Sequence, residues 1–381
     1  MQAKQYDYIF LGAGCATLSI VMRMLASGKF SDKKILLIDK DDKKKNDRTW
    51  CFWEEGEGFF ENIVCHNWEH LFFITDDKNI ALEISPYRYK MVRGIDFYQY
   101  CFSVINADNN IDVLNGNISF NEGKIFFNEE KLIFKKTAFI FNSIHFPAKP
   151  QQGKFYLLQH FKGWVIETNE NCFDDKKATL MDFRVAQDHG TTFVYVLPLS
   201  PQKALVEYTL FTEKLLPQNE YNTALNVYIN TFLKLKNYKI TEEEYGVIPM
   251  TNAVFPAYDK GMYHIGTAGG NTKASTGYTF RFIQKQADEI VKELVKNKTE
   301  INLKGPHKRF QFYDSTLLHI LSKQLLGGKE IFSTLFEKNR ASTVLKFLDN
   351  DTTIFEEIKL LPSLPKKIFI KAGFKEFIKM F

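Results

Sequence analysis

The chain of 381 residues lacks the marks of several protein classes. It has only five cysteines, an odd number, and no two of them have the C-x-x-C spacing of a zinc or redox site. No stretch reaches the roughly 18 consecutive apolar residues that a membrane-spanning helix requires. The net charge of +5 is small and is spread along the chain, which argues against a nucleic-acid partner. We therefore predict a reduced, cytoplasmic protein that has no metal site and binds no nucleic acid.

The first forty residues have the pattern of a dinucleotide-binding βαβ unit. An apolar strand over residues 6–11 leads through a Gly-x-Gly turn into a helix over 16–27, and a second strand over 34–39 ends in an acid. The glycines let a pyrophosphate approach the helix N-terminus, and the acid suits the ribose of FAD or NAD better than that of NADP. The alternative is a βαβ unit without a cofactor, and Thr17 stands where a third glycine is usual. The expected cofactor-binding residues are Gly12, Ala13, Gly14, Cys15, Ala16, Asp39 and Lys40.

An unusual aromatic segment, Asp47-Arg-Thr-Trp-Cys-Phe-Trp53, follows a polar loop. Its pattern fits neither a clean strand nor an amphipathic helix. One interpretation is a buried loop that packs on the first domain. The other is a wall of the active site, in which Arg48 lies near a flavin or a carboxylate and aromatic side chains face an apolar substrate. In this second interpretation, the substrate-lining residues of the segment are Trp50, Phe52 and Trp53.

Two later segments are also candidates for cofactor contact. Arg93 precedes a helix-like stretch over 94–107, where hydroxylase-like flavoproteins often have an arginine on the cofactor, and the alternative is a surface ion pair. The loop 266–277 is rich in Gly, Ser and Thr and precedes a helix over 278–296. Its backbone N–H groups suit the ribityl–phosphate side or the pyrimidine edge of a flavin, unless the loop only caps the helix. The loop residues assigned to the cofactor are Gly266, Thr267, Gly269, Gly270, Thr276 and Gly277.

A β-hairpin is expected from strands over 192–199 and 204–211. Glu207 interrupts the second, otherwise apolar strand. Burial would raise the pKa of its carboxyl group, as a general acid near neutral pH requires. The alternative is a glutamate on the solvated face of an edge strand. Tyr195 and Pro198, in the first strand, are assigned to the substrate pocket.

In their order along nearly the whole chain, the motifs resemble those of lycopene cyclases of the bacterial β-cyclase type, flavoproteins of carotenoid biosynthesis. The resemblance implies that Glu207 is the catalytic acid. Relatives often have a second acid where Tyr208 stands, so Glu207 would work alone here. The matching segments are Gly12-Ala-Gly14, Asp47-Arg-Thr-Trp-Cys-Phe-Trp53, Leu180-Met-Asp-Phe-Arg184, Val196-Leu-Pro-Leu-Ser200, Leu205-Val-Glu-Tyr-Thr209, Gly246-Val-Ile-Pro-Met250 and Gly266-Thr-Ala-Gly-Gly-Asn-Thr-Lys-Ala-Ser-Thr-Gly-Tyr278.

The resemblance also implies a fold and a reaction. The fold is α/β: a Rossmann-type FAD/NAD(P)-binding domain with an inserted, mainly β substrate domain, as in hydroxylase-like flavoproteins, and a C-terminal helical region. The reaction is a non-redox cyclisation of the linear ends of lycopene or related acyclic carotenoids to β-ionone rings, giving β-carotene through γ-carotene. It requires reduced FAD, with NAD(P)H as the reductant. Two other classes stay open: a redox flavoenzyme acting on an isoprenoid or other apolar substrate, and a non-catalytic flavin protein at a membrane surface.

The expected domains alternate along the chain. The FAD-binding domain takes residues 1–60, 88–146 and 245–298. The β-rich substrate domain takes 61–87 and 147–244, and the helical region takes 299–381.

The end of the chain has the pattern of a basic amphipathic helix. Ile370, Phe374, Phe377 and Phe381 have the spacing of one helix face, between several lysines. Such a helix suits the surface of an anionic bilayer, which would place the protein peripherally on the inner face of the cell membrane. The alternative is a helix that docks on the core of the protein itself.

Overall fold

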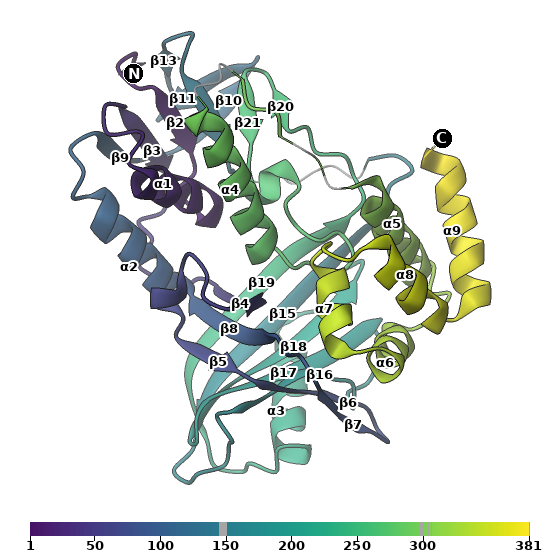
Figure 1. Ribbon diagram of the computed structural model, residues 1–381. Helices are drawn as coiled ribbons and strands as arrows, with labels where there is room; N and C mark the ends of the chain where they lie inside the picture. Colours follow the sequence, from purple (N-terminus) through teal and green to yellow (C-terminus); the bar gives the residue numbers. More distant parts are fainter. Residues whose placement is uncertain (145–150, 297–299, 304, 306, 381) are drawn as a thin grey trace.

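The computed structural model describes residues 1–144, 151–296, 300–303, 305 and 307–380. The domain boundaries expected near residues 147 and 298 lie outside the described residues. Figure 1 shows an α/β part at the upper left, a large sheet below it and a group of helices on the right.

The α/β part is built on a sheet whose central strands are parallel and buried on both faces. Continuous apolar sequences such as Tyr8-Ile-Phe-Leu11 are typical of these strands, because neither face meets water. The expected return of residues 140–143 to this sheet is confirmed, since they pair in parallel with the first strand of the βαβ unit. In spatial order the strands are β20 (Tyr258–Asp259), β21 (Met262–His264), β14 (Phe139–Asn142), β2 (Tyr8–Leu11), β3 (Ile35–Asp39) and β9 (Ile111–Asn115), with only β20 antiparallel to its neighbour.

Helices cover one face of this sheet, and small strands cover the other. The helix that connects β2 to β3 ends at Gly28, whose positive φ of 64° lets the chain turn back. The helices on this face are α1 (Cys15–Ser27), α2 (Gly94–Ile105) and α4 (Phe280–Val295). The strands on the opposite face are β10 (Ile118–Asn121), β11 (Lys124–Phe127) and β12 (Glu130–Lys131), with β1 (Gln2–Ala3) and β13 (Ile133–Phe134) beside them.

The second sheet is large and mostly antiparallel. It contains the expected hairpin, which is confirmed, with Tyr195 opposite Glu207. One face packs on α3 (Gln218–Thr231), and the other packs on the C-terminal helices. In spatial order its strands are β19 (Lys239–Thr251), β15 (Tyr156–Glu167), β18 (Lys203–Thr212), β17 (Thr191–Ser200), β16 (Lys177–Asp182), β6 (His70–Ile74) and β7 (Asn79–Leu82).

The aromatic segment forms a strand, so its interpretation as neither strand nor helix is wrong. The small sheet that contains it consists of β4 (Thr49–Glu55), β8 (Tyr87–Arg93) and β5 (His66–Trp68). Trp50 and Phe52 pack into the core of the α/β part, whereas Cys51 and Trp53 pack into the core of the large sheet. Because both faces of β4 are covered by protein, its sequence does not alternate between apolar and polar residues.

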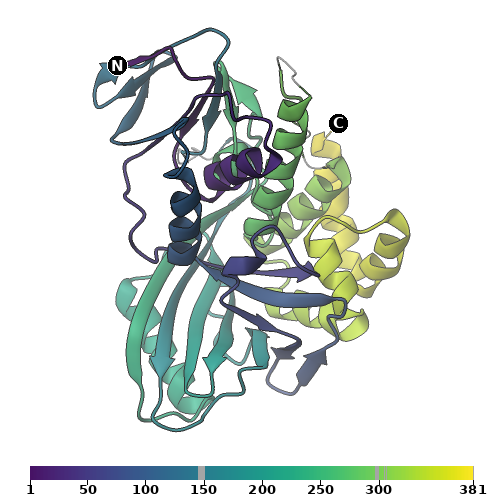
Figure 2. The ribbon, with the colours of Figure 1, turned by 60° about the vertical axis from the view of Figure 1, so that its left-hand side comes forward.

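The C-terminal region is helical, as expected. The last helix packs along α5 through Ala372, Gly373 and Glu376, and Glu376 Oε1 lies 2.6 Å from Nδ1 of His319. Figures 1 and 2 both show these two helices side by side at the edge of the molecule. Phe381 lies outside the described residues. The helices of this region are α5 (Lys308–Ser322), α6 (Gly328–Lys338), α7 (Ala341–Leu348), α8 (Ile354–Leu360) and α9 (Lys366–Met380).

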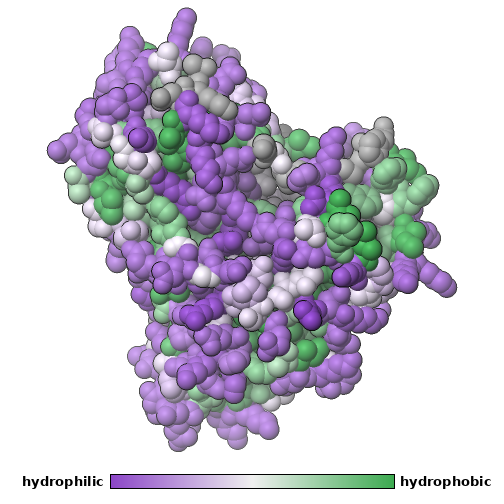
Figure 3. Space-filling model, viewed as in Figure 1, coloured by the Kyte–Doolittle hydropathy of each residue, from purple (hydrophilic) through white to green (hydrophobic). Residues whose placement is uncertain are grey.

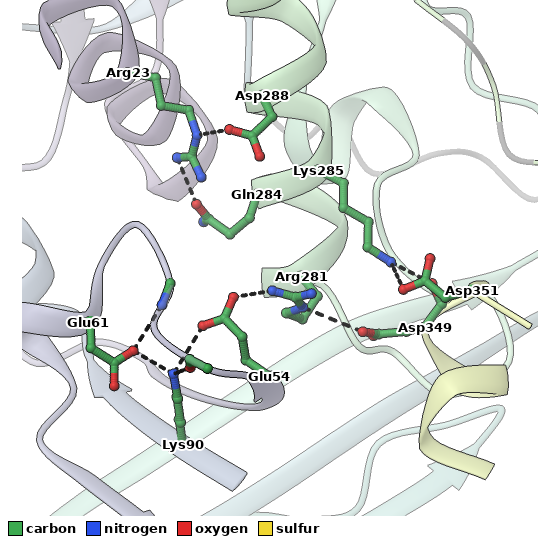
Figure 4. Close-up of polar contacts among 12 residues, drawn as sticks. Arg23, Glu54, Glu61, Lys90, Arg281, Gln284, Lys285, Asp288, Asp349 and Asp351 are labelled. Carbon is green, nitrogen blue, oxygen red and sulfur yellow. Dashed lines mark hydrogen bonds and ion pairs between the residues drawn. The ribbon is translucent and has the colours of Figure 1, made fainter. Parts of the chain in front are cut away.

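Ion pairs connect these parts across their boundaries (Figure 4). Arg23 of α1 pairs with Asp288 of α4. Arg281, also on α4, pairs with Glu54 of β4 and, at 3.5 Å, with Asp349 at the end of α7. Helix α4 is therefore tied to the βαβ unit, to the small sheet and to the C-terminal helices.

The most buried cation of this network is Lys90 on β8. Its side chain is 1% exposed, and its Nζ pairs with Glu54 and Glu61 and donates to the carbonyl oxygen of Gly56 at 2.6 Å. A buried ammonium group is tolerated only with such partners, because burial removes its hydration. Lys90 thus holds the loop after β4 against β8.

Replacing Lys90 by Met should destabilise the fold by about 3 kcal/mol, because two carboxylates lose their buried partner. Urea unfolding measures this change. Lys78→Met is the matched control: the pair of Lys78 with Glu337 is 2.9 Å long and solvent-exposed, so its loss should change the unfolding midpoint much less than the loss of Lys90 does. Equal unfolding midpoints for the two variants would contradict the role given to Lys90.

Candidate active site

A cavity of about 630 Å³ lies where the α/β part, the small sheet and the large sheet meet. The turn after β2 and the start of α1 border it on one side, and strands β18 and β19 border it on the other. The predicted site residues that line it are Gly12, Gly14, Cys15, Ala16, Asp39, Lys40, Arg48, Trp50, Tyr195, Glu207, Gly266, Thr267 and Gly277.

The glycine turn opens the N-terminus of α1 to this cavity. Gly12 has a φ of 93°, and a Cβ there would lie 2.4 Å from Oγ of Ser143. Gly14 precedes the helix without a side-chain cap, the first turn contains no acid, and no atom lies within 4 Å of where its Cβ would be. The hydroxyl of Thr17 donates to the carbonyl oxygen of Gly12 at 2.6 Å, so the residue at the third-glycine position ties the turn to the helix. This arrangement suits a pyrophosphate.

Asp39 fixes the same turn from the end of β3. Its Oδ2 accepts a hydrogen bond from the backbone N–H of Ala13 at 2.6 Å and lies 3.4 Å from Nζ of Lys43. Ala13 itself is fully buried and does not line the cavity. A carboxylate oxygen has further acceptor capacity, so Asp39 can both hold the turn and accept from a ribose hydroxyl.

The loop 266–277, which precedes α4, borders the cavity with Gly266, Thr267 and Gly277. Gly266 has a φ of 59°, and a Cβ there would lie 2.8 Å from Cβ of Ala16, so its glycine permits close contact with α1. Gly277 packs on Gln159, whose buried side-chain oxygen has no hydrogen-bond partner within the described ranges. This oxygen is an acceptor that a bound group can satisfy. The predicted residues Gly269, Gly270 and Thr276 shape the loop but do not line the cavity.

Glu207 belongs to a row of residues that crosses the large sheet. The register places Tyr195 opposite Glu207, Glu207 opposite Gly163 of β15, and Gly163 opposite Glu244 of β19. Directly opposite residues project from the same face of a sheet, and here the three side chains line the cavity. A Cβ on Gly163 would lie 2.9 Å from Cγ of Glu244. The missing side chain therefore leaves the room in which the two glutamates meet.

The carboxyl groups of Glu207 and Glu244 are hydrogen-bonded to each other. Threonine hydroxyls hold them in place: Thr209 donates to Oε1 of Glu207 at 2.8 Å, and Thr49 donates to Oε2 of Glu244 at 2.6 Å. Strand β18 lies between β15 and β17, so the alternative of a solvated edge strand is wrong.

Burial raises the pKa of both carboxyl groups, and that of Glu207 lies well above its ordinary value. The negative charge of Glu244 raises the pKa of Glu207 further. The hydrogen bonds from Thr49 and Glu207 act in the opposite direction on Glu244 and lower its pKa. Of the two carboxyl groups, Glu207 is therefore the one whose protonated form is favoured more strongly, and Glu244 is the one whose ionised form its hydrogen bonds favour.

Four predicted residues lie elsewhere. Arg93 forms a two-bond ion pair with Asp96, at 2.6 and 2.9 Å, on the surface. Phe52 stacks on Phe280 in the core of the α/β part. Trp53 packs into the core of the large sheet, and Pro198 is buried in β17; neither residue lines the cavity.

Sequence reasoning missed Glu244. It is the last of three consecutive glutamates, a run that is typical of a solvated surface. In the strand, Glu243 faces the opposite side and pairs with Lys162 at 3.0 Å, whereas Glu244 faces the cavity. Tyr208 faces α3, so a second acid does accompany Glu207, but it comes from β19 rather than from the next residue of β18.

Within the described ranges, no group of His, Cys, Asp or Glu residues could hold a metal ion. In the same part of the chain, no helix is long and apolar enough to cross a membrane.

Comparison with known sequences decides the family. The profile of the family described as Lycopene cyclase protein matches residues 7–372. The chain belongs to the lycopene cyclase family. It is also similar to a curated lycopene beta-cyclase of Pseudescherichia vulneris, with 33% identity over 118 residues. This match spans only 29% of the chain and 30% of that relative.

Solved structures show the same architecture. A geranylgeranyl bacteriochlorophyll reductase-like protein of Thermoplasma acidophilum is similar over 100% of both chains, with a TM-score of 0.56 and 13% identity. A flavoprotein/dehydrogenase of Cytophaga hutchinsonii is similar over 100% of both chains, with a TM-score of 0.59 and 12% identity. At these identities the likeness concerns the fold alone. The expected α/β flavoprotein fold with an inserted β-rich part and a C-terminal helical region is confirmed.

Proposed function

We propose that this member of the lycopene cyclase family is a lycopene β-cyclase, which closes the linear ends of lycopene into β-ionone rings without net oxidation or reduction. The observation that carries this proposal is the buried carboxyl group of Glu207, which lines the cavity and whose pKa burial raises well above its ordinary value. Protonation of a carbon–carbon double bond needs an acid that keeps its proton at neutral pH, and burial supplies that condition.

The proposed cofactor is FAD, reduced by NAD(P)H. The turn at Gly12 and the N-terminus of α1 suit its pyrophosphate, Asp39 suits its ribose, and the loop 266–277 with Gln159 suits the flavin end. Reduced flavin in this place would supply an electron-rich ring that stabilises a neighbouring cation.

In the proposed mechanism, Glu207 gives its proton to the terminal double bond of the substrate. The resulting tertiary cation is attacked by the neighbouring double bond, which closes a six-membered ring. Tyr89, Tyr195 and Tyr278 line the cavity, and their rings can stabilise the cation by cation–π attraction. Tyr89 and Tyr195 are buried, so this wall of the cavity keeps out water, which would otherwise convert the cation to an alcohol.

A second candidate is a redox flavoenzyme that acts on an isoprenoid or another apolar substrate. It is favoured by the likeness in fold to the reductase-like protein of Thermoplasma acidophilum. The two candidates differ in stoichiometry: a cyclase uses NAD(P)H only to keep the flavin reduced, whereas a reductase consumes one molecule for each product formed.

We also propose that the protein binds the inner face of the cell membrane through α8 and α9. Helix α8 exposes the apolar side chains of Ile354, Phe355 and Ile358, and helix α9 exposes those of Ile370 and Phe374. Figure 3 shows the hydrophobic surface that gathers over this part of the molecule, on the right-hand side. The lysines that accompany it suit an anionic bilayer, and an apolar polyene substrate would be dissolved there. These lysines are Lys359, Lys366, Lys367, Lys371 and Lys375.

Gly12→Ala should lower the affinity for FAD by at least about 10-fold, because alanine is strained at this φ and its Cβ would collide with Ser143. Flavin absorbance of the purified protein and titration with FAD measure the effect. Gly123→Ala is the matched control, since Gly123 also has a positive φ, of 73°, but lies in open space between β10 and β11. Equal flavin content in the two variants would contradict the proposed cofactor site.

Glu207→Gln should abolish the formation of β-carotene in lycopene-accumulating cells and slow the purified enzyme by about 10²–10⁴-fold, because the amide cannot donate a proton as an acid. Pigment chromatography measures the products. Glu213→Gln, at an exposed position just after β18, is the control and should cyclise normally. If Glu207→Gln cyclises lycopene normally, Glu207 is not the catalytic acid. If the unchanged chain consumes NAD(P)H in proportion to product and forms no ring, the redox candidate is correct.

The double variant Ile370→Ser, Phe374→Ser should weaken binding to vesicles that contain phosphatidylglycerol by at least about 10-fold, because two apolar side chains lose their burial in lipid. Vesicle flotation measures the bound fraction. Val227→Ser changes another exposed apolar residue, on α3, and should bind as before. If the double variant, the control and the unchanged chain float equally with the vesicles, this surface does not bind the membrane. If binding does not depend on the phosphatidylglycerol content, the lysines have no role in it.

A further inference from the structure

The proposed reaction needs a base as well as an acid. A proton enters the substrate when the cation forms, and another leaves the ring when its double bond forms. If the proposed function holds, the cavity must therefore contain an acceptor for the second proton close to the donor of the first.

Glu244 has the geometry of this acceptor. It lies across Gly163 from Glu207, lines the same cavity and is hydrogen-bonded to Glu207. The hydroxyl of Thr49 donates to one of its oxygens at 2.6 Å, which stabilises the ionised form. Two carboxyl groups, one favoured in its protonated form and the other stabilised in its ionised form, thus line the same cavity side by side.

The other titratable groups that face the pair do not compete for this role. Cys51 on β4, Tyr89 on β8, Tyr195 on β17 and Tyr278 beside the loop all lie close enough to interact electrostatically with Glu207, and burial raises the pKa of each. They are therefore neutral and weak as bases. On β19, Glu242 lies close enough for its charge to raise the pKa of Glu244, and it pairs with Lys203 at 3.5 Å. Among the described residues, no lysine, arginine or histidine forms an ion pair with Glu207 or Glu244.

We propose that Glu244 is the catalytic base that removes the ring proton and returns it to Glu207. The O–H bond of Glu207 breaks, and its proton forms a C–H bond with one carbon of the terminal double bond. The electron pair of the next double bond forms the ring C–C bond. A ring C–H bond then breaks, its electron pair becomes the ring double bond, and its proton goes to the carboxylate of Glu244.

Glu207 is now the carboxylate and Glu244 the acid. The proton returns through the hydrogen bond that joins them, and the pair is ready for the next end group. No electron and no proton is gained or lost overall, as an isomerisation requires.

The test uses the purified flavin-loaded chain with lycopene in phosphatidylglycerol-containing vesicles under reducing conditions, across a range of pH. Glu244→Gln should lose at least about 10²-fold in kcat at every pH, with an unchanged flavin content. In D2O, the lycopene recovered from this variant should contain deuterium at its ends. Glu207 still donates a deuteron to the terminal double bond, and when the cation reverts the same carbon can lose its original hydrogen as a proton. Glu243→Gln, the neighbour on the opposite face, should leave the rate unchanged.

The pH profile separates a base from a residue that only tunes Glu207. Loss of the Glu244 charge lowers the pKa of Glu207, so a tuning role predicts the full wild-type rate at a lower pH. Recovery of that rate overturns the proposal, and so does a variant that forms neither product nor deuterated lycopene.

A second variant keeps the proposal testable if Glu244→Gln does not fold. Thr49→Val removes the hydrogen bond that favours ionised Glu244 and so raises its pKa, which should move the acidic limb of the profile to higher pH. If the acidic limb of the pH–rate profile stays at the same pH in Thr49→Val, Glu244 is not the base. Failure of the unchanged chain to form rings is a different result, since it refutes the proposed function itself.

Discussion

The site depends on the register of three antiparallel strands. Glu207 and Glu244 come from β18 and β19, which are separated by the whole width of β15, and only Gly163 between them leaves room for the side chains to meet. A shift of one residue in either strand would turn one carboxyl group to the opposite face of the sheet. The strand register of the sheet therefore brings the two carboxyl groups together, and the cavity gives a ligand access to them.

The two ends of the cavity differ in the charge that they favour. At the end formed by α1, backbone N–H groups at the helix start favour a negative group, and the turn is held by Asp39 and Thr17. At the other end, burial disfavours charge and raises the pKa of Glu207 well above its ordinary value. A nucleotide and an apolar end group can thus be accommodated in one continuous space, each where its chemistry is favoured.

Local sequence patterns predicted much of this fold. The βαβ unit, the hairpin of β17 and β18 and the helical C-terminal region each follow from the period and the turn residues of a single segment. Strand β4 was not predicted, because aromatic side chains on both of its faces remove the alternation of apolar and polar residues that indicates a strand. Glu244 was not predicted as a site residue, because its partner Glu207 lies more than thirty residues away in the sequence and its orientation depends on the pairing of β19 with β15. The contact of Arg93 with Asp96 could not be separated from a cofactor contact, since an arginine before a helix suits both.

Strand β4 also determines how the halves of the molecule can move. Its alternate side chains belong to two different cores, with Phe52 stacked on Phe280 at 4.4 Å and Trp53 against Tyr278 at 4.8 Å. A hinge between the α/β part and the large sheet would have to split this single strand and wet aromatic rings on both of its faces. Such an opening is costly in free energy, so the two walls of the cavity move as one body. The distances between the groups at the nucleotide end and the carboxyl pair are consequently set when the chain folds, before any ligand arrives.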